Sequence, residues 1–220
     1  MPQFLNTLDL TNIGIQGQRV YARLRDVPGS KWVDMGNVED LAPTTNADTN
    51  QLTTARNGVR VPAKTLTTSV TDTFGFDTLD TTDPTIRGLW NGVAAVPVVS
   101  ADGAQGMVRT PGGKYEAELA VLEPGAPDTD SALTYFPRVE LAGNGKRASG
   151  GTEAGRLSFL ATILADEGYT VPATVDASTP KAPNGYDVVV EASSDPVGDL
   201  HAILDLLAAP YDADGGAATP

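Results

Sequence analysis

The 220-residue sequence predicts a mainly β protein with a single domain spanning residues 1–220, and two observations support this fold class. First, turn-forming pairs such as Asn57-Gly58 and Pro28-Gly29 recur between short apolar runs, and such pairs supply the backbone angles of tight turns. Second, apolar and polar residues alternate in most of those runs, as they do in strands with one buried face. At this length a core needs neither disulfides nor metals, and the chain contains no cysteine.

The first two strands are predicted to form a hairpin. Even positions are apolar and odd positions are polar or amphipathic over residues 19–25, and a turn then leads into a second strand at 31–35. Arg19, Arg23 and Arg25 fall on the polar side of the first strand. We expect this side to be solvated or to form ion pairs with a neighbouring subunit.

A polar stretch follows at residues 37–64, with little apolar content. Connections of this length are uncommon inside compact domains and are usually functional or mobile, so we expect a long loop here. The next strand is predicted at 66–76, where apolar residues occupy one face and threonine and serine occupy the other.

Two helices are predicted. Asp83-Pro84 provides an N-cap and a first-turn proline for a short helix that ends at residues 91–92. A second helix is predicted to begin at 194–196, and its apolar residues keep helical spacing as far as Pro210, where we expect it to end.

Three further strands are predicted from alternation, at residues 114–121, 135–141 and 187–191. Pro137 has no N–H to donate, so it favours an edge or a bulge in the second of these strands. Residues 157–164 fit helical and strand spacing equally well, and eight residues are too few for periodicity to decide.

No motif in the sequence indicates catalysis. The one histidine, His201, is expected at the boundary of the last helix, and the glycine-rich segments 112–114 and 143–147 lack the spacing of a phosphate-binding loop. The clustered aspartates lack the spacing of a calcium-binding loop. We therefore expect no enzymatic activity, no cofactor and no metal.

The charge of the chain is unevenly distributed. The formal net charge is −13, and residues 1–65 have a balance of +1 while residues 66–220 carry −14. Affinity for phosphates comes mainly from clustered Lys and Arg, so this balance argues against a surface that grips nucleic acid. No stretch approaches eighteen apolar residues and the N-terminus has no leader pattern, so we expect no membrane binding and a soluble protein.

The order of these predicted elements resembles that of the major tail tube proteins of long-tailed bacteriophages, over roughly residues 15–192. The matching features are the hairpin Val20–Met35, Gly36–Asp40 before the polar stretch, the threonine strand Thr65–Asp72, the helix ending in Leu89–Gly92, and the pair Tyr135–Leu141 and Leu157–Thr162. The resemblance favours a strand for residues 157–164. The helix Ser194–Ala209 has no counterpart that we can assign.

The resemblance implies a β-sandwich subunit with a flanking helix, of which six copies form a ring whose inner strands close one barrel. The rings stack into a tube that conducts DNA. Residues 37–64 would be the loop that reaches a neighbouring subunit or ring, with Asn57 and Gly58 as candidate contacts beside the three arginines. Residues 1–15 and 194–220 would be arms between rings. The implied partners are further copies of the chain, a tape-measure protein and tail-end proteins, in a virion tail assembled in the host cytoplasm.

A conduit for DNA should not bind its cargo, and an acidic wall repels phosphates near its surface. The candidate carboxylates for a face toward the lumen are Glu116, Glu118 and Glu140, with Asp72 and Asp77 as further ones. The alternatives that remain open are a monomeric secreted or surface β-sandwich that acts in binding or adhesion, and the inner tube protein of a contractile injection system.

Overall fold

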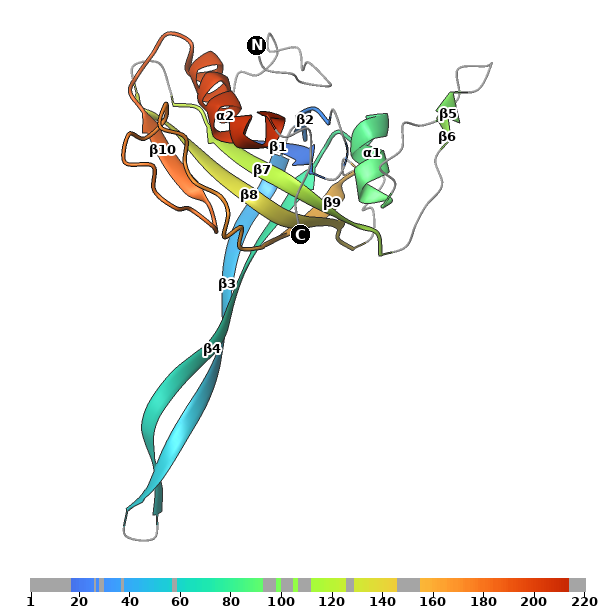
Figure 1. The fold of residues 1–220 in the computed structure, drawn as a ribbon. Coiled ribbons are helices and arrows are strands. Elements are labelled where there is room, and N and C mark those ends of the chain that lie inside the picture. Colours follow the sequence, from blue (N-terminus) through green and yellow to red (C-terminus); the bar gives the residue numbers. More distant parts are fainter. Residues whose placement is uncertain are drawn as a thin grey trace.

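The computed structural model describes residues 17–25, 27, 30–36, 38–56, 59–92, 98–99, 105–106, 112–125, 129–145 and 155–213. Within them the chain forms ten strands and two helices (Figure 1). In chain order these are β1 (Arg19–Leu24), β2 (Val33–Asp34), β3 (Val38–Arg56), β4 (Val59–Thr78), α1 (Pro84–Trp90), β5 (Val98–Val99), β6 (Gln105–Gly106), β7 (Lys114–Glu123), β8 (Ser131–Gly143), β9 (Leu157–Ile163), β10 (Tyr186–Val190) and α2 (Pro196–Ala213).

One curled antiparallel sheet forms the body of the molecule. Its strand order is β2-β1-β7-β8-β9-β4-β3, and β10 pairs with β8 beside this path. Strands β5 and β6 pair only with each other among the described residues. The prediction of a mainly β, barrel-like fold with a short flanking helix and a C-terminal helix is confirmed, and residues 157–164 form a strand.

A bulge in β8 allows this strand to pair with two partners on one side. Ala117 of β7 lies opposite Val139, but Leu119 lies opposite Phe136, so β8 has one extra residue here. Pro137 sits in this interval, as the sequence predicts, and its missing N–H costs no ladder hydrogen bond. Strand β10 pairs with β8 up to Tyr135, and β9 pairs with it from Val139 onward.

The two faces of the sheet bury separate apolar clusters. The first face carries a core that reaches from Val20 in β1 to Phe76 in β4, where Phe76 stacks on Phe159 with ring centroids 5.3 Å apart. Helix α1 closes this core through Ile86 and Leu89. Among the described residues, helix α2 and residues 164–185 cover the second face over β1, β10 and the adjoining parts of β7 and β8 and leave the rest of it uncovered (Figure 1).

Helix α1 forms where the sequence predicts it. The Asp83 carboxylate accepts hydrogen bonds from the backbone N–H groups of Thr85 at 2.7 Å and Ile86 at 3.0 Å, and Pro84 occupies the first turn. Asn91 caps the other end, and Gly92 follows with a φ of +74°, the left-handed conformation that favours glycine.

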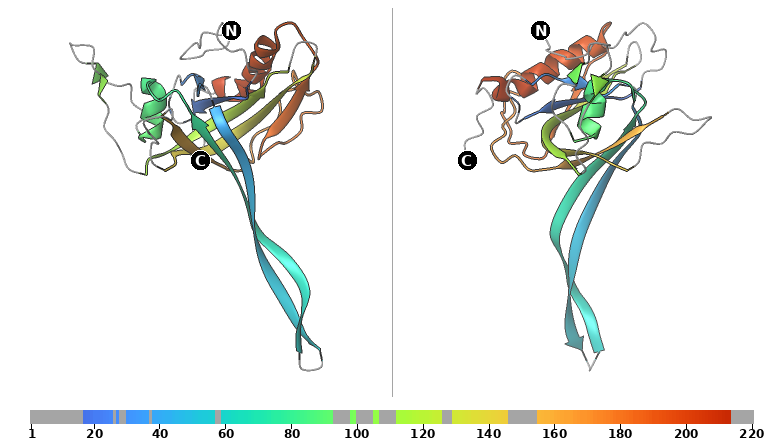
Figure 2. Two further views of the ribbon diagram at one scale, coloured as in Figure 1. Left: turned by 180° about the vertical axis from the view of Figure 1, so that it is seen from behind. Right: turned by 90° about the vertical axis from the view of Figure 1, so that its right-hand side faces the viewer.

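The loop predicted at residues 37–64 is wrong as secondary structure. Strands β3 and β4 form one long hairpin that projects from the body in every view (Figures 1 and 2). The low apolar content has a physical cause, because beyond the pair Thr73 and Thr162 no third strand adjoins the hairpin among the described residues. A ribbon with two solvated faces needs no apolar stripe, and its threonines favour strands.

Helix α2 continues three residues beyond the predicted end at Pro210. Two side chains hold its last turns: the hydroxyl of Tyr169, in the segment 164–185, donates to the Leu207 carbonyl at 3.0 Å, and Nη2 of Arg23 in β1 donates to the Ala208 carbonyl at 3.3 Å. These two hydrogen bonds stabilise the C-terminal carbonyls and offset the hydrogen bond that Pro210 cannot donate.

Candidate functional site

The uncovered part of the second face carries paired charges. Glu116 of β7 and Glu140 of β8 lie directly opposite each other in the register. Each carboxylate is bound by a cation of the same face: Arg138 Nε lies 2.8 Å from Glu116, and Lys114 Nζ lies 2.5 Å from Glu140. These pairs offset the repulsion expected between two opposed carboxylates.

Asp77 of β4 continues this face toward the edge of the sheet. Its carboxylate lies 3.9 Å from Arg156 Nη1, and Nη2 of the same guanidinium lies 3.1 Å from Glu39 of β3. Glu39 and Asp77 are themselves opposite each other in the register, so Arg156 bridges two like charges. Of the five predicted lumen carboxylates, Glu116, Glu140 and Asp77 therefore share one partly exposed face.

The prediction that Glu118 faces a lumen is wrong. Its side chain is only 1% exposed, and both of its carboxylate oxygens accept hydrogen bonds from Arg23, at 2.8 and 2.9 Å. The helix α2 layer covers this part of the second face and puts Glu118 in the interior. Burial raises the pKa of the Glu118 carboxyl, and the Arg23 guanidinium opposes this shift.

The arginines predicted at a subunit interface serve mainly within the chain. Arg23 pairs with Glu118 and lies 5.3 Å from the ring centroid of Trp32. Arg25 binds Asp166 at 2.8 Å and stacks over the ring of Tyr211 at 4.4 Å. For Arg23 the predicted interface role is wrong, because α2 and residues 164–185 cover that side of β1 and bury it. Arg25 is paired within the chain, and its interface role stays a prediction.

Arg19, the third of these arginines, is half-buried beside Tyr21 and donates a hydrogen bond to its hydroxyl. Asn57 and Gly58 lie outside the described residues, between the ends of β3 and β4. Their predicted role at a subunit interface therefore stays a prediction.

Asp166 forms a second anchor for the end of α2. The Tyr211 hydroxyl donates a hydrogen bond of 2.6 Å to its carboxylate, and Arg25 donates one of 2.8 Å. Burial alone would raise the pKa of Asp166, but these hydrogen bonds hold it below the usual value. Arg25 also donates to the carbonyl of Pro137 at the β8 bulge, so one guanidinium joins the helix, the loop and the sheet.

A cleft of about 330 Å³ opens on the first face, at the base of the hairpin. Asp72, the last predicted lumen carboxylate, lines it and therefore lies on the opposite face from Glu116 and Glu140. The cleft is lined by Gln18, Leu41, Pro43, Thr44, Thr45, Asp72, Thr73, Phe74, Val121, Glu123, Thr134, Phe136 and Ile163. The sequence gives no signal for this cleft, because its lining comes from strands distant in the chain.

Most of the net negative charge of the chain lies in one layer, residues 164–213, which contains none of the five predicted lumen carboxylates. Residues 164–213, which include β10 and α2, contain a single basic residue, Lys181. Their acidic residues are Asp166, Glu167, Asp176, Asp187, Glu191, Asp195, Asp199, Asp205 and Asp212. A count of charges by segment would have found this layer from the sequence.

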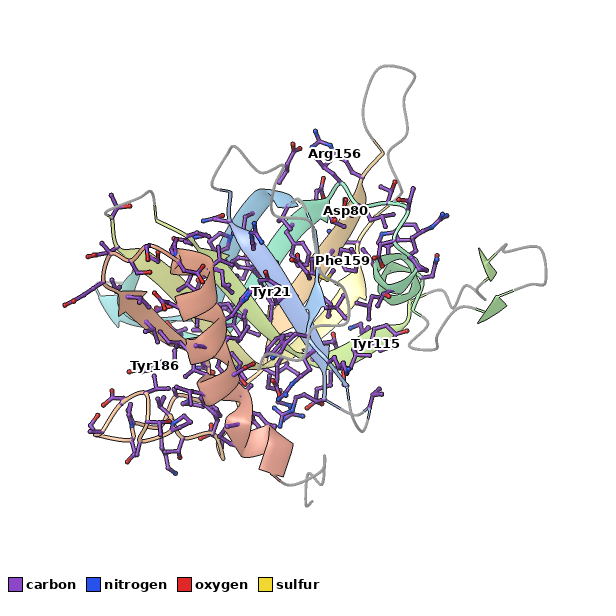
Figure 3. All side chains as sticks on the ribbon, turned by 90° about the horizontal axis from the view of Figure 1, so that it is seen from above. Tyr21, Asp80, Tyr115, Arg156, Phe159 and Tyr186 are labelled. Carbon is purple, nitrogen blue, oxygen red and sulfur yellow. The ribbon has the colours of Figure 1, made fainter. Side chains whose placement is uncertain are left out.

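His201 of α2 contacts Tyr21 of β1, and Figure 3 labels Tyr21 beside the helix. His201 Nε2 is 3.0 Å from the Tyr21 hydroxyl, and the two rings meet edge to face at 5.2 Å. Burial lowers the pKa of His201 to about 4, and the positive charge of Arg19 acts in the same direction. The neutral imidazole thus belongs to the contact between helix and sheet.

Replacing His201 with Gln is expected to reduce the pH dependence of stability between pH 6.5 and pH 4. The folded-state pKa of about 4 lies below the ordinary 6.5, so the unfolded chain binds the proton more readily in this window. The stability present above pH 6.5 is therefore lost as the pH falls toward 4. Urea unfolding at steps of pH measures the effect, and His201 is the chain's one histidine. Identical slopes for H201Q and wild type would contradict the burial of a neutral imidazole.

Within the described residues no group of three or more His, Asp or Glu side chains is arranged to hold a metal ion. In the same part of the chain no helix has both the length and the apolar character needed to cross a membrane.

Comparison with known proteins shows a similarity at the level of structure. No protein-family model and no curated protein matches the sequence. A chain from the structure of the phage p2 baseplate in its activated conformation with Sr is similar, with a TM-score of 0.33 and 13% identity. The alignment covers 83% of this chain and 62% of that chain, so the present protein spans less than two thirds of its length.

Proposed function

We propose that this protein is a structural subunit of a bacteriophage tail, in which six copies close into a ring and stacked rings form a hollow tube that conducts viral DNA. The observation that carries the proposal is the β3–β4 hairpin, a long ribbon that leaves the body and pairs with no third strand among the described residues (Figure 2). The resemblance in element order supports the same reading.

The hairpin favours assembly for a physical reason. Beyond Asp72 its two strands bind only each other among the described residues, so both outer edges present unpaired backbone groups. A two-stranded ribbon is at best marginally stable in water by itself, and open edges tend to pair with other chains. Contact with another copy would stabilise the ribbon and cover those edges.

The sheet of the body also has strand edges without a hydrogen-bonded neighbour among the described residues. Strands β2 and β3 end the sheet, so the curled sheet is an open part of a barrel and not a closed one. Pairing between copies around a ring would remove these edges, and full closure is the arrangement that does so completely. This supports one barrel shared by several subunits.

The uncovered part of the second face suits the wall of such a tube. Its cations Lys114, Arg138 and Arg156 are each bound to a carboxylate of the same face. A basic side chain held in this way offers little affinity for passing phosphates, since that affinity comes from cations that release counterions from DNA. The lumen proposal thus depends on neutralised cations together with the acidic balance of the chain.

The remaining parts follow from the same proposal. The subunit has no enzymatic role and binds no cofactor or membrane, and DNA is a cargo held without sequence preference. A tape-measure protein would occupy the tube during assembly and tail-end proteins would close it. The acidic layer of residues 164–213 covers part of the second face of the sheet, so it would border the lumen wall and add negative charge beside it.

Sedimentation velocity over a concentration series, followed by electron microscopy of the heaviest fraction, tests the proposal. The expected result is concentration-dependent growth into rings or hollow filaments. A monodisperse monomer at every concentration would instead support the alternative of a β-domain that acts alone. Assembly only in the presence of a sheath protein would support the tube of a contractile injection system.

A further inference from the structure

The cleft at the base of the hairpin combines apolar and uncharged polar side chains with two carboxylates. Phe74, Phe136 and Ile163 form apolar walls, with the two phenylalanine rings 6.0 Å apart. Its ionisable lining residues are two carboxylates, Asp72 and Glu123, and none of its lining residues among the described part of the chain is basic. A matching occupant therefore needs apolar surface together with positive charge.

Asp72 is the lining residue that most needs a partner. Its Oδ1 atom is buried and has no hydrogen-bond partner among the described residues. Glu123 differs, because its carboxylate accepts a hydrogen bond from the side-chain amide of Gln18. Burying a carboxylate oxygen without a hydrogen-bond donor lowers the stability of the fold. A charged donor from another molecule would supply the missing hydrogen bond and offset this cost.

The end of the hairpin has the complementary composition. Residues 53–64 contain three basic residues and no acidic one, in a chain with a net charge of −13. The basic residues are Arg56, Arg60 and Lys64, and the same segment contains Val59, Val61 and Pro62. We propose that this segment of one copy docks in the cleft of another copy, with a basic side chain bound to Asp72; the inference rests on the self-assembly proposed above.

The segment cannot reach the cleft of its own chain. Thr45 and Asp72 pair at the cleft, and the last pair of the hairpin, Arg56 and Val59, lies eleven residues farther along β3. At about 3.3 Å per residue the ribbon carries the segment about 36 Å away from the cleft. Figure 2 shows that the ribbon continues outward and does not fold back.

Docking between copies would then be head to tail, since the two contacting surfaces differ. Such a contact leaves one hairpin and one cleft unused at the ends of any open chain of subunits, so it closes into a ring or propagates as a filament. The contact therefore suits both a ring and a stack of rings, and the symmetry of the assembly decides between them.

Disulfide trapping tests the contact directly, because the chain contains no cysteine of its own. Thr45→Cys places a thiol in the cleft and Ala55→Cys places one near the end of the hairpin. When the two single variants are mixed under assembly conditions and oxidised, we expect a disulfide-linked heterodimer, and the double variant should give a ladder of oligomers. The control pairs Ala55→Cys with Thr162→Cys, on the opposite face of the sheet, and should give no crosslink.

Charge reversal provides the second arm of the test. Asp72→Lys and Arg60→Asp are each expected to reduce assembly at least tenfold, while the two changes combined in one chain should restore it. Asp187→Lys makes the same charge change on exposed β10 and is expected to leave assembly unchanged. Equal effects of Asp72→Lys and Asp187→Lys would overturn the inference.

The outcomes separate this inference from the proposed function. Hollow tubes that form without the Thr45 to Ala55 crosslink would overturn the docking and leave the tube intact. A crosslinked ladder without rings or tubes would support the docking and contradict the tube. Crosslinking of Thr45→Cys to Asn6→Cys instead of Ala55→Cys would assign the cleft to the N-terminal segment and also overturn the inference.

Discussion

A chain in which residues 47–70 are replaced by a two-residue Asn-Gly turn is expected to fold normally and to lose assembly completely. Asn46 and Thr71 pair in the register, so a tight turn can join them. The cut removes a part of the ribbon that pairs with no third strand in the described part of the chain, and it leaves Phe74 and Phe76 in the core. Sedimentation velocity measures the loss of assembly, and thermal unfolding checks the body.

The matched control keeps the length of the hairpin. Thr67→Ser changes one exposed threonine of β4 outside residues 53–64 and keeps every residue of the ribbon, so this variant is expected to assemble as the wild type does. If the shortened chain formed the same rings or filaments as the control, the hairpin would have no role in assembly. If the shortened chain failed to fold, the ribbon would contribute to the body in a way that the register does not indicate.

Glu118→Ala is expected to have the largest effect on stability, a loss of about 3–5 kcal/mol in the free energy of unfolding, because it leaves Arg23 buried without its carboxylate. The pair is held by two hydrogen bonds between side chains that are 8% and 1% exposed. Urea unfolding followed by tryptophan fluorescence measures the change, since Trp32 lies against the Arg23 guanidinium.

Two controls identify the cause of that loss. Replacing both partners, as Arg23→Met with Glu118→Leu, is expected to recover most of the stability, because no charge is then left unpaired in the interior. Glu140→Ala breaks the exposed pair with Lys114 and is expected to cost less than about 1 kcal/mol. Equal losses for Glu118→Ala and Glu140→Ala would contradict the buried position of Glu118.

The local features of the fold could be predicted from the sequence because they depend on neighbouring residues. Asp83 caps α1 two and three residues ahead of its donors, and Gly92 ends the helix in the left-handed region. The bulge at Pro137 follows from a missing N–H in a central strand. Each of these signals acts within a few residues, so no knowledge of the fold was needed.

The prediction of the lumen residues failed where packing of another element on the sheet determines whether a side chain is buried or exposed. Glu116 and Glu118 stand two residues apart on one strand and share a face, yet α2 covers only the second of them. Alternation cannot reveal this difference, because it reports which residues share a face and not what packs on it. Asp72 and Asp77 lie on opposite faces because they are an odd number of residues, five, apart on one strand. Alternation alone would have predicted this difference.

The hairpin was missed for a related reason. Strand prediction relies on an apolar stripe, and a ribbon that no element covers has none. Thr44 and Thr73 pair across the hairpin. The threonine-rich strand predicted at 66–76 is part of β4, which pairs with β3 along the hairpin. The polar partner strand, residues 38–56, carried the information in its β-branched residues instead.

A cryo-EM reconstruction of the assembled protein tests the central claim most directly. The account predicts rings of six copies stacked around an open lumen, with Glu116, Glu140 and Asp77 on the inner wall and the β3–β4 hairpin extended onto a neighbouring copy. An assembly with those three carboxylates on its outer surface, or with no continuous lumen, would contradict it.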